Sequence, residues 1–584
     1  KEGLPLQAPT RVDPIRFEVI RNGLLEVSEE MAAALRLSAY STNIKTRCDF
    51  SCALFDRWLR PVAQAFTLPN HLGSMVQTVR SAVTDYGPQN LQERDALVVN
   101  YPYSGGVHLN DIVLISPVHH EGEIFGYVAN LAHHVDVGGG APASIGAFRE
   151  VYQEGVIIPP VKMVSRGRLV PDVFQLILAQ VRAKRETAGD FRAQIAANNT
   201  GVRRVTGLLE RVGPETLAFY IDEIMAYTDR RTQAEMARLP RGTFAVEGCM
   251  DSDGYTDEPV RLVAKVVIDD QGVLFDLNGS DPQRKAPINS TYAQSYAACA
   301  FVLKCLTDPD IPVNAGFYRH VRMAAPEGTV VNCALPYPVV GGWETMTRLI
   351  EVILKALSQA VPALVPAGTK GMGGQVGTGG VNPRTGDYYC FYEAVGGGFG
   401  GRVSSDGPDA VQVHGSNTEN APVEETEINY PLRIDRYELI DNSDGAGTYR
   451  GGLGLHRKYV ILDHNASFTV LSDRDRWGPW GLFGGDSGRK AYYILNPDGE
   501  ARELGSKMTM QLEPGDVISF QTPGGGGYGA PRERDPQMVL RDVREGKVSV
   551  ERARSVYKVA VDTAAWAVDE QETAGLRSTE PHSK

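Results

Sequence analysis

Apolar residues near the start of the chain recur at helical spacing. Asp13 and Pro14 supply an N-cap and a proline at the first helical position. The apolar residues that follow lie three or four positions apart: Phe17, Ile20, Leu24, Val27, Met31 and Leu35. This pattern predicts a long amphipathic helix that ends near residues 40–43. A second helix is predicted from about Pro69 to Val83.

Short runs in the same half of the chain have the composition of β-strands. They cover residues 50–55, 96–100, 112–118 and 124–132. The last two runs are joined by His119-His120-Glu121-Gly122, which predicts a tight hairpin turn because glycine readily adopts a positive φ angle. We expect His119 and His120 to be exposed turn residues without a chemical role.

The hairpin predicts which residues face each other. If His120 and Glu121 form a two-residue loop, paired positions sum to 241, so His108 lies opposite His133 and Asp111 lies opposite Asn130. Opposed residues have Cβ atoms about 4.5–5.5 Å apart, close enough for one metal ion to bridge them. A loop shifted by one residue moves each partner by two positions, but the two histidines and Asp111 stay at one end of the hairpin.

The pattern changes towards the C-terminus. Residues from about 171 to 239 are mostly helical in character, whereas short alternating runs beyond Arg241 predict an antiparallel sheet. Those runs cover 243–247, 260–268 and 273–277, with helices predicted at 293–306 and 345–360. Glycine-rich segments and strand-like runs continue to Gly529, and 535–561 is helical again.

Helices therefore group in the first half and antiparallel strands in the second, which predicts the α+β fold class. Three regions are predicted: a metal-site region at 1–240, a β-rich and glycine-rich region at 241–530, and a helical tail at 531–584.

Composition narrows the class of protein. The 584 residues are 42% hydrophobic and 22% charged, and 62 glycines with 35 prolines indicate an enzyme-like, loop-rich chain. The net charge of −12 and the lack of a basic stripe argue against a nucleic-acid partner. No apolar run reaches the roughly 18–20 residues of a membrane span, and the N-terminus lacks the order of a signal peptide. Seven scattered cysteines without a CxxC pair fit a reducing cytoplasm, which is the expected location.

The stretch 101–140 is the densest in histidine. His108 and Asp111 have HxxD spacing, and with His133 they offer two imidazoles and a carboxylate. This set suits Mn²⁺, Fe²⁺ or Zn²⁺ and leaves coordination positions open for water or substrate. Exposed histidines beside a turn are the alternative interpretation of the same pattern.

Two further residues in this stretch are candidates for catalysis. His134 and Asp136 follow in the sequence HHVDVGG, where a carboxylate can hold a ligating imidazole in the correct tautomer. Surface polar residues at a strand end are an equally good interpretation.

Familiar catalytic motifs are missing from the sequence. There is no G-x-x-x-x-G-K-[ST] phosphate loop and no G-x-S-x-G nucleophile elbow, so a serine hydrolase is disfavoured. The glycine-rich segments favour close backbone packing or substrate approach over a phosphate cradle. Cys48 has no evident histidine partner, which indicates a packed thiol.

Ordered sequence blocks along nearly the whole chain resemble the hydantoinase B family. They are DPIRFEVIRNGL, CDFSCALFD, FTLPNHLGSM, GGVHLNDI, AHHVDVGG, AGDFRAQIAAN, SNTENAPVEETE, PGGGGYG and VLRDVREGKVSVERARSVY. This family includes the B subunits of ATP-dependent hydantoinases and caprolactamase, the C-terminal half of 5-oxoprolinase, and the larger subunits of acetone and acetophenone carboxylases.

The resemblance implies a manganese or zinc site formed by Asp49, His108, Asp111 and His133. It also implies a hydantoinase A type partner, which binds ATP on an actin-like fold, in a hetero-oligomer such as (AB)₂. The partner phosphorylates the oxygen of an amide, and the metal subunit then directs water at the activated carbon.

The expected function is therefore the opening of a hydantoin, lactam or 5-oxoproline ring. Two alternatives stay open. In the first, the chain is a subunit of an ATP-dependent ketone carboxylase. In the second, it is a scaffold whose metal is structural, although closed structural zinc sites usually use cysteine.

Overall fold

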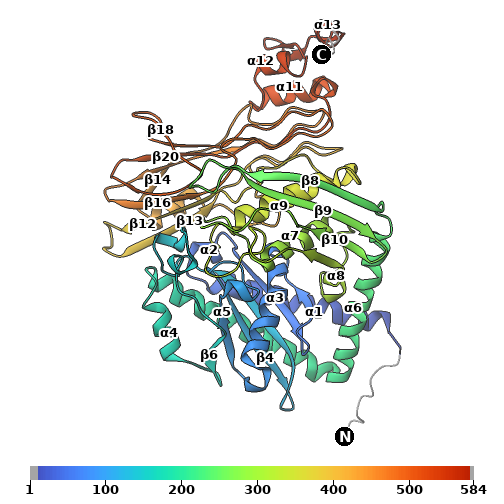
Figure 1. Cartoon of the computed structure of the whole chain (residues 1–584), viewed down its shortest axis with the longest axis vertical. Helices are drawn as coiled ribbons and strands as arrows, with labels where there is room; N and C mark the ends of the chain where they lie inside the picture. Colours follow the sequence, from blue (N-terminus) through green and yellow to red (C-terminus); the bar gives the residue numbers. More distant parts are fainter. Residues whose placement is uncertain (1–10, 579–584) are drawn as a thin grey trace.

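The computed structural model describes residues 11–578. Helices and sheets form a layered body from which the C-terminal segment projects (Figure 1). Helices dominate the first half and sheets the second, so the predicted α+β class is confirmed. The division into three regions stays a prediction.

The first layer is a seven-stranded sheet that holds the predicted hairpin. Its strand order is β2-β1-β5-β4-β3-β6-β7. The strands are β1 (Phe50–Asp56), β2 (Pro61–Gln64), β3 (Ala96–Val99), β4 (Asp111–His120), β5 (Glu123–His133), β6 (Val161–Ser165) and β7 (Arg168–Leu169).

The strands of this sheet are buried on both sides because helices cover both of its faces. Cys52 and Leu54 of β1 pack in the cluster with α1 (Pro14–Ser38), α5 (Lys184–Val212) and α6 (Pro214–Met236). Ala53 and Phe55 alternate with them and pack in the cluster with α3 (Pro69–Tyr86). The helix predicted from Asp13 is confirmed as α1, with Asp13 as its N-cap.

The hairpin is confirmed, but its predicted register is wrong. The loop is Glu121-Gly122, with φ angles of 50° and 86° that suit a type I′ turn. A register shift between Val118 and His119 adds one more residue to the offset. Asp111 therefore pairs with His133, whereas Asn130 pairs with Leu114.

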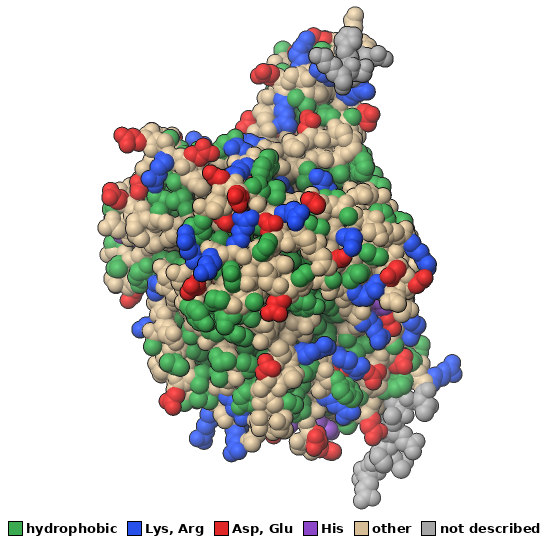
Figure 2. All heavy atoms as spheres, in the orientation of Figure 1, with side chains coloured by type: hydrophobic (Ala, Val, Ile, Leu, Met, Phe, Trp, Pro, Cys, Tyr) green, Lys and Arg blue, Asp and Glu red, His purple; other side chains and the backbone are tan. Residues whose placement is uncertain are grey.

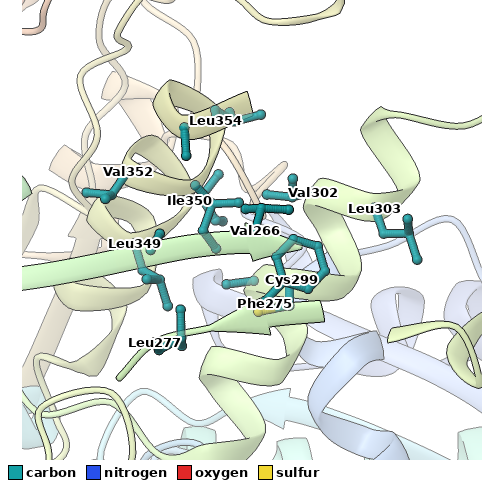
Figure 3. Packing of buried hydrophobic residues seen from close by; sticks show 14 of the residues in the cluster. Val266, Phe275, Leu277, Cys299, Val302, Leu303, Leu349, Ile350, Val352 and Leu354 are labelled. Carbon is teal, nitrogen blue, oxygen red and sulfur yellow. The ribbon is translucent and has the colours of Figure 1, made fainter. Parts of the chain in front are cut away.

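A second layer begins with β8 (Gly242–Met250), β9 (Val260–Asp269), β10 (Gly272–Asp276) and β11 (Val321–Ala324). Its strand order is β11-β10-β9-β8, and β11 pairs with β10 in parallel, which the antiparallel prediction did not include. The helices α7 (Tyr292–Cys305) and α9 (Gly342–Leu357) pack on this sheet. Figure 3 shows Val302 and Ile350 from the two helices meeting Val266 and Phe275 from the strands.

A close contact between helices joins the two layers. A Cβ atom on Gly73 of α3 would lie 2.7 Å from the Cβ atom of Ala297 on α7, so only glycine allows this approach. The contact fixes the N-terminal turn of α3, which carries His71, against the rest of the body.

Two further sheets complete the body, in the orders β13-β12-β16-β19 and β14-β15-β20-β17-β18. The first contains β12 (Gln375–Val381), β13 (Tyr388–Ala394), β16 (Ala466–Leu471) and β19 (Lys507–Leu512). The second contains β14 (Leu432–Leu439), β15 (Leu455–Ile461), β17 (Tyr492–Leu495), β18 (Arg502–Glu503) and β20 (Val517–Gln521).

Glycine-rich segments pack backbone against backbone beside these sheets. A Cβ atom on Gly525 would lie 1.9 Å from the carbonyl oxygen of Phe399. A Cβ atom on Gly451 would in turn lie 1.9 Å from the carbonyl oxygen of Gly525. The prediction of close backbone packing is confirmed for this part of the chain.

The remaining elements are mostly short. They are α2 (Thr42–Lys45), α4 (Pro171–Leu178), α8 (Ala315–Tyr318), α10 (Val423–Asn429), α11 (Pro536–Arg544), α12 (Val550–Ser555), α13 (Glu570–Ser578), β21 (Val561–Asp562) and β22 (Ala567–Val568). The face of the molecule in Figure 2 shows acidic and basic side chains interspersed. Within residues 11–578, no helix has the length and apolar composition needed to cross a bilayer.

Candidate metal centre

The histidine and aspartate side chains predicted to bind metal come together at one end of the hairpin. Asp49 precedes β1, Asp111 begins β4 and His133 ends β5. The three strands are neighbours in the order β1-β5-β4, and the backbone N–H of His133 donates to the carbonyl oxygen of Asp49 at 3.0 Å. His108 lies in a tight turn, because the N–H of Asp111 donates to the carbonyl oxygen of His108 at 3.1 Å.

His108, Asp111 and His133 have the spacing of a metal-binding group. Each offers one ligand atom, and these atoms all lie within 4.8 Å of one another. The Nε2 atom of His108 is 3.3 Å from the Oδ2 atom of Asp111, and the imidazole rings of His108 and His133 are 4.9 Å apart between centroids.

Asp49 borders this group through a histidine that sequence reasoning missed. The Nε2 atom of His71 lies 3.7 Å from Asp49 Oδ1 and 3.6 Å from Asp111 Oδ1, between the two carboxylates. His71 stands in the first turn of α3, within the block FTLPNHLGSM that carried the family resemblance. That block was the available signal, because the spacing of the other ligands does not point to residue 71.

Burial sets the protonation of these side chains. Asp49 is 5% exposed, and burial raises its pKa from 3.8 to about 6 against the opposing charge of Arg47. Burial, followed by the charge of Asp49, raises the pKa of Asp111 well above its usual range. Two carboxyl groups this close resist ionisation together unless a cation compensates them.

The imidazoles are shifted in the opposite direction. Burial lowers the pKa of His71 to about 3 and the pKa of His108 to about 4. Burial also lowers the pKa of His133 well below 6.5, with His108 as the next cause. At neutral pH each ring is uncharged and has one nitrogen lone pair to offer, which is the form that binds metal.

Several polar atoms of the centre lack hydrogen-bond partners among residues 11–578. Both carboxylate oxygens of Asp111, Nδ1 of His108 and Nε2 of His133 are buried without a hydrogen bond. Buried polar atoms without partners are costly, and a divalent cation satisfies these lone pairs. The residues therefore fit the implied metal.

The Asn43 side chain orients the His133 ring, with 3.2 Å between Asn43 Nδ2 and His133 Nδ1. This contact holds the ring in place, and the roles of donor and acceptor in it depend on the tautomer of His133. The His133 ring also stacks on Tyr392, with 4.7 Å between centroids.

The structure does not bring His134 and Asp136 into this group. The Nε2 atom of His134 is 3.0 Å from Gln194 Oε1 of α5, and the ring packs against Phe191. Asp136 accepts from the guanidinium of Arg182 at 3.1 Å. Neither residue is a surface residue, and a catalytic role for them stays a prediction.

A second acidic group, formed by Asp251, Asp473 and Asp475, also has ligand spacing. Asp473 accepts from Lys507 at 3.0 Å and from Arg348, which also lies 3.3 Å from Asp251. These cations compensate Asp251 and Asp473, which form an ion-pair network, whereas Oδ1 of Asp475 is buried without a hydrogen-bond partner among residues 11–578.

Comparison with known proteins places this chain in a family. The family model described as Hydantoinase B/oxoprolinase matches residues 13–531. An uncharacterized protein of Methanocaldococcus jannaschii is 40% identical over 573 residues, covering 97% of this chain and 100% of the relative. A putative B subunit of a D-/L-hydantoinase from Pseudomonas sp. is 31% identical and covers 97% of this chain and 98% of the relative.

The chain matches only part of one larger relative. The 5-oxoprolinase 1 of Arabidopsis thaliana is 32% identical over 89% of this chain, and the match spans 42% of that protein.

Two solved structures share the fold. The ATP-dependent caprolactamase from Pseudomonas jessenii has a TM-score of 0.90 and 28% identity, over 98% of this chain and 100% of the matched chain. Acetone carboxylase has a TM-score of 0.88 and 20% identity, over 97% of this chain and 82% of the matched chain. At 20% identity the second likeness shows the fold alone.

Proposed function

The chain belongs to the hydantoinase B/oxoprolinase family, and we propose that it is the hydrolytic subunit of an ATP-dependent cyclic amide hydrolase. The observation that carries the proposal is the buried group of His108, Asp111 and His133, with Asp49 beside it. The substrate is a hydantoin, a lactam or 5-oxoproline, whose amide oxygen a hydantoinase A type partner phosphorylates.

Each side chain of the centre has a defined task in this proposal. His108 and His133 give neutral imidazole nitrogens, and Asp111 and Asp49 give carboxylate oxygens, to one Mn²⁺ or Zn²⁺ ion. When bound, such an ion supplies Lewis-acid polarisation and lowers the pKa of water to about 7. Asn43 and Tyr392 hold the His133 ring in place.

Burial of the centre also serves the chemistry. His71 and His133 are each 2% exposed, so the site separates a reactive phosphorylated amide from bulk solvent. The reaction balances as one amide, one ATP and two water molecules giving the ring-opened amino acid, ADP and phosphate. The ring C–N bond breaks, and the nitrogen leaves as an amine from a lactam or 5-oxoproline and as the terminal urea nitrogen from a hydantoin.

The partner is part of the proposal because relatives are named as subunits of larger enzymes, including the beta subunit of a caprolactamase. We propose that ATP binds to the partner, in an assembly such as (AB)₂, since this sequence has no phosphate-binding loop. A location in the cytoplasm stays a prediction.

Two alternative functions are less favoured. A ketone carboxylase uses the same fold, but the caprolactamase is more similar in sequence and is matched over its full length. A purely structural metal is disfavoured because imidazole and carboxylate ligands are typical of open sites, whereas closed structural sites use thiolates.

The test is ATP consumption by the complex of this chain with its partner. We expect ADP and phosphate to form with hydantoin, 5-oxoproline or a lactam, together with a ring-opened product identified by mass spectrometry. ATP consumption with a ketone and bicarbonate, and not with any amide, would show a carboxylase instead. Hydrolysis of an amide by this chain without partner and ATP would contradict the division of labour.

A further inference from the structure

Arg47 is a fully buried arginine beside the metal centre, with no exposed surface. Its Nε atom donates to the carbonyl oxygen of Glu419 at 3.3 Å. Its Nη1 atom donates to Asn43 Oδ1 at 3.2 Å and to the carbonyl oxygen of Tyr392 at 3.0 Å. These acceptors are all uncharged, and Nη2 has no partner among residues 11–578.

Other buried arginines of the protein are compensated by carboxylates. Arg534 is also fully buried, and its Nη1 and Nη2 atoms lie 2.6 Å from Asp406 and Asp542. Arg457 lies 3.0 Å from Glu393. No carboxylate of residues 11–578 forms an ion pair with Arg47, although its charge acts on the nearby Asp49 carboxyl, so the fold leaves this guanidinium without a hydrogen-bonded anion.

The position of Arg47 connects this charge to the centre. Its guanidinium lies over the Tyr392 ring at 4.8 Å, and that ring stacks on His133. Asn43 lies within hydrogen-bonding distance of both Arg47 and His133. The left-handed backbone of Cys48, with φ of 56°, turns the chain between Arg47 and Asp49.

A metal ion does not remove the charge of Arg47. A divalent cation neutralises the two carboxylates of Asp49 and Asp111, and the imidazoles are uncharged, so one positive charge remains in the filled centre. A cation takes lone pairs but gives none to an N–H group. The free Nη2 of Arg47 therefore needs an oxygen acceptor from another source.

Asn70, next to His71 in the sequence, is a second buried side chain whose polar atoms are unsatisfied within the described part of the chain. Asn70 is 1% exposed and directly precedes His71, which lies between Asp49 and Asp111. Neither side-chain atom of Asn70 has a hydrogen-bond partner among residues 11–578.

We propose that Arg47 is the oxyanion-binding residue of this centre and that Nη2 holds an anionic oxygen of the substrate. This inference rests on the proposed function, in which the substrate arrives phosphorylated. A phosphoryl group and a substrate carboxylate share the required chemistry, because both are oxyanions that pair with a guanidinium.

The binding test needs neither ATP nor partner. Inorganic phosphate is titrated calorimetrically into the full chain loaded with one equivalent of Mn²⁺ or Zn²⁺. We expect Arg47→Lys to weaken phosphate binding about tenfold and Arg47→Gln to weaken it further, because a charge-assisted hydrogen bond is lost. The control is Arg534→Lys, an equally buried arginine in the C-terminal segment, which should leave phosphate affinity unchanged. Unchanged affinity in a folded, metal-loaded Arg47→Gln protein would overturn the inference.

A crystal structure of the wild-type chain with metal and phosphate gives an answer that does not depend on variants folding. Phosphate oxygen within hydrogen-bonding distance of Arg47 Nη2 supports the inference. Phosphate bound in the crystal without contacting Arg47 overturns it.

Turnover by the complex then identifies the source of the oxyanion. If Arg47 holds the phosphoryl group, Arg47→Lys lowers kcat/KM equally for 5-oxoproline and for hydantoin, which has no carboxylate. If it holds a carboxylate, the loss is confined to 5-oxoproline, and no loss with either substrate argues against both roles. A complex that hydrolyses no amide, but in which this chain binds phosphate through Arg47, would refute the proposed function and leave this inference standing.

Discussion

Asp49→Asn is predicted to stabilise the metal-free protein while weakening metal binding. The pKa of Asp49 rises from 3.8 to about 6 on folding, mainly because of burial. One pKa unit is worth about 1.4 kcal/mol, so the charged carboxylate costs the folded state about 3 kcal/mol at pH 7. An asparagine side chain has the same shape without this charge. Removing the charge of Asp49 also removes one cause of the raised pKa of Asp111.

The sign of the pH dependence follows from proton binding. Between pH 3.8 and about 6 the folded protein holds a proton on Asp49 that the unfolded chain has released. The free energy of unfolding therefore falls as the pH rises through this window. The extra free energy of unfolding of Asp49→Asn, relative to the wild type, should be fully present above pH 6 and should disappear near pH 4.

Metal opposes this gain in stability. At a metal concentration about 1,000 times the Kd, binding stabilises the wild type by about 4 kcal/mol, and the variant loses about 1.4 kcal/mol of this for each tenfold rise in its Kd. The assay is urea denaturation at pH 7 and pH 4.5, with chelator and with metal. The reasoning would be refuted if metal-free Asp49→Asn were less stable than the wild type at pH 7. It would also be refuted if the variant gained the same free energy of unfolding at both pH values.

Asp56→Asn is the matched control for this measurement. Asp56 has the same 5% exposure and lies at the end of β1, but its Oδ2 atom accepts from Arg60 Nε at 2.6 Å. Because the asparagine would leave Arg60 without this carboxylate, Asp56→Asn should destabilise the protein with or without metal.

Two contrasts between neighbouring or similar residues test other parts of the account. His133→Ala should abolish metal binding, measured by elemental analysis. His134→Gln should retain about one equivalent of metal and lose about 1–2 kcal/mol of stability, because the hydrogen bond to Gln194 is lost. A folded, metal-loaded His134→Gln protein without turnover would support a catalytic role for His134. Gly525→Ala should lower the melting temperature or prevent folding, because its Cβ atom would lie 1.9 Å from a backbone oxygen. In Gly505→Ala the new Cβ atom meets no atom within 4 Å, so this control should melt like the wild type. Equal melting temperatures of the two variants would show that the glycine-rich packing described above is wrong.

Local patterns in the sequence were sufficient for the hairpin and its ligands. The glycine at position 122 and the alternation in both strands predicted a two-residue turn, and this brought Asp111 and His133 to the same end. The register was wrong because the loop lies one residue further along and the strands slip between Val118 and His119. Side-chain alternation does not encode such an irregularity.

Long-range contacts account for what the sequence did not predict. His71 reaches the centre because Gly73 lets α3 pack closely on α7, far along the chain. Arg47 is unusual only because its partners Tyr392 and Glu419 supply neutral oxygens, which no local pattern reveals. The parallel pairing of β11 with β10 likewise depends on a crossover, not on the composition of β11.

The most direct test of the central claim is a metal titration of the complex followed by turnover. The complex of this chain with its partner is stripped of metal, and amide-dependent ATP hydrolysis is measured as Mn²⁺ or Zn²⁺ is added back. We predict that activity rises in proportion to bound metal and stops rising at about one equivalent per chain, and that Asp111→Ala shows no rise. Full activity in the metal-stripped wild type would contradict the account.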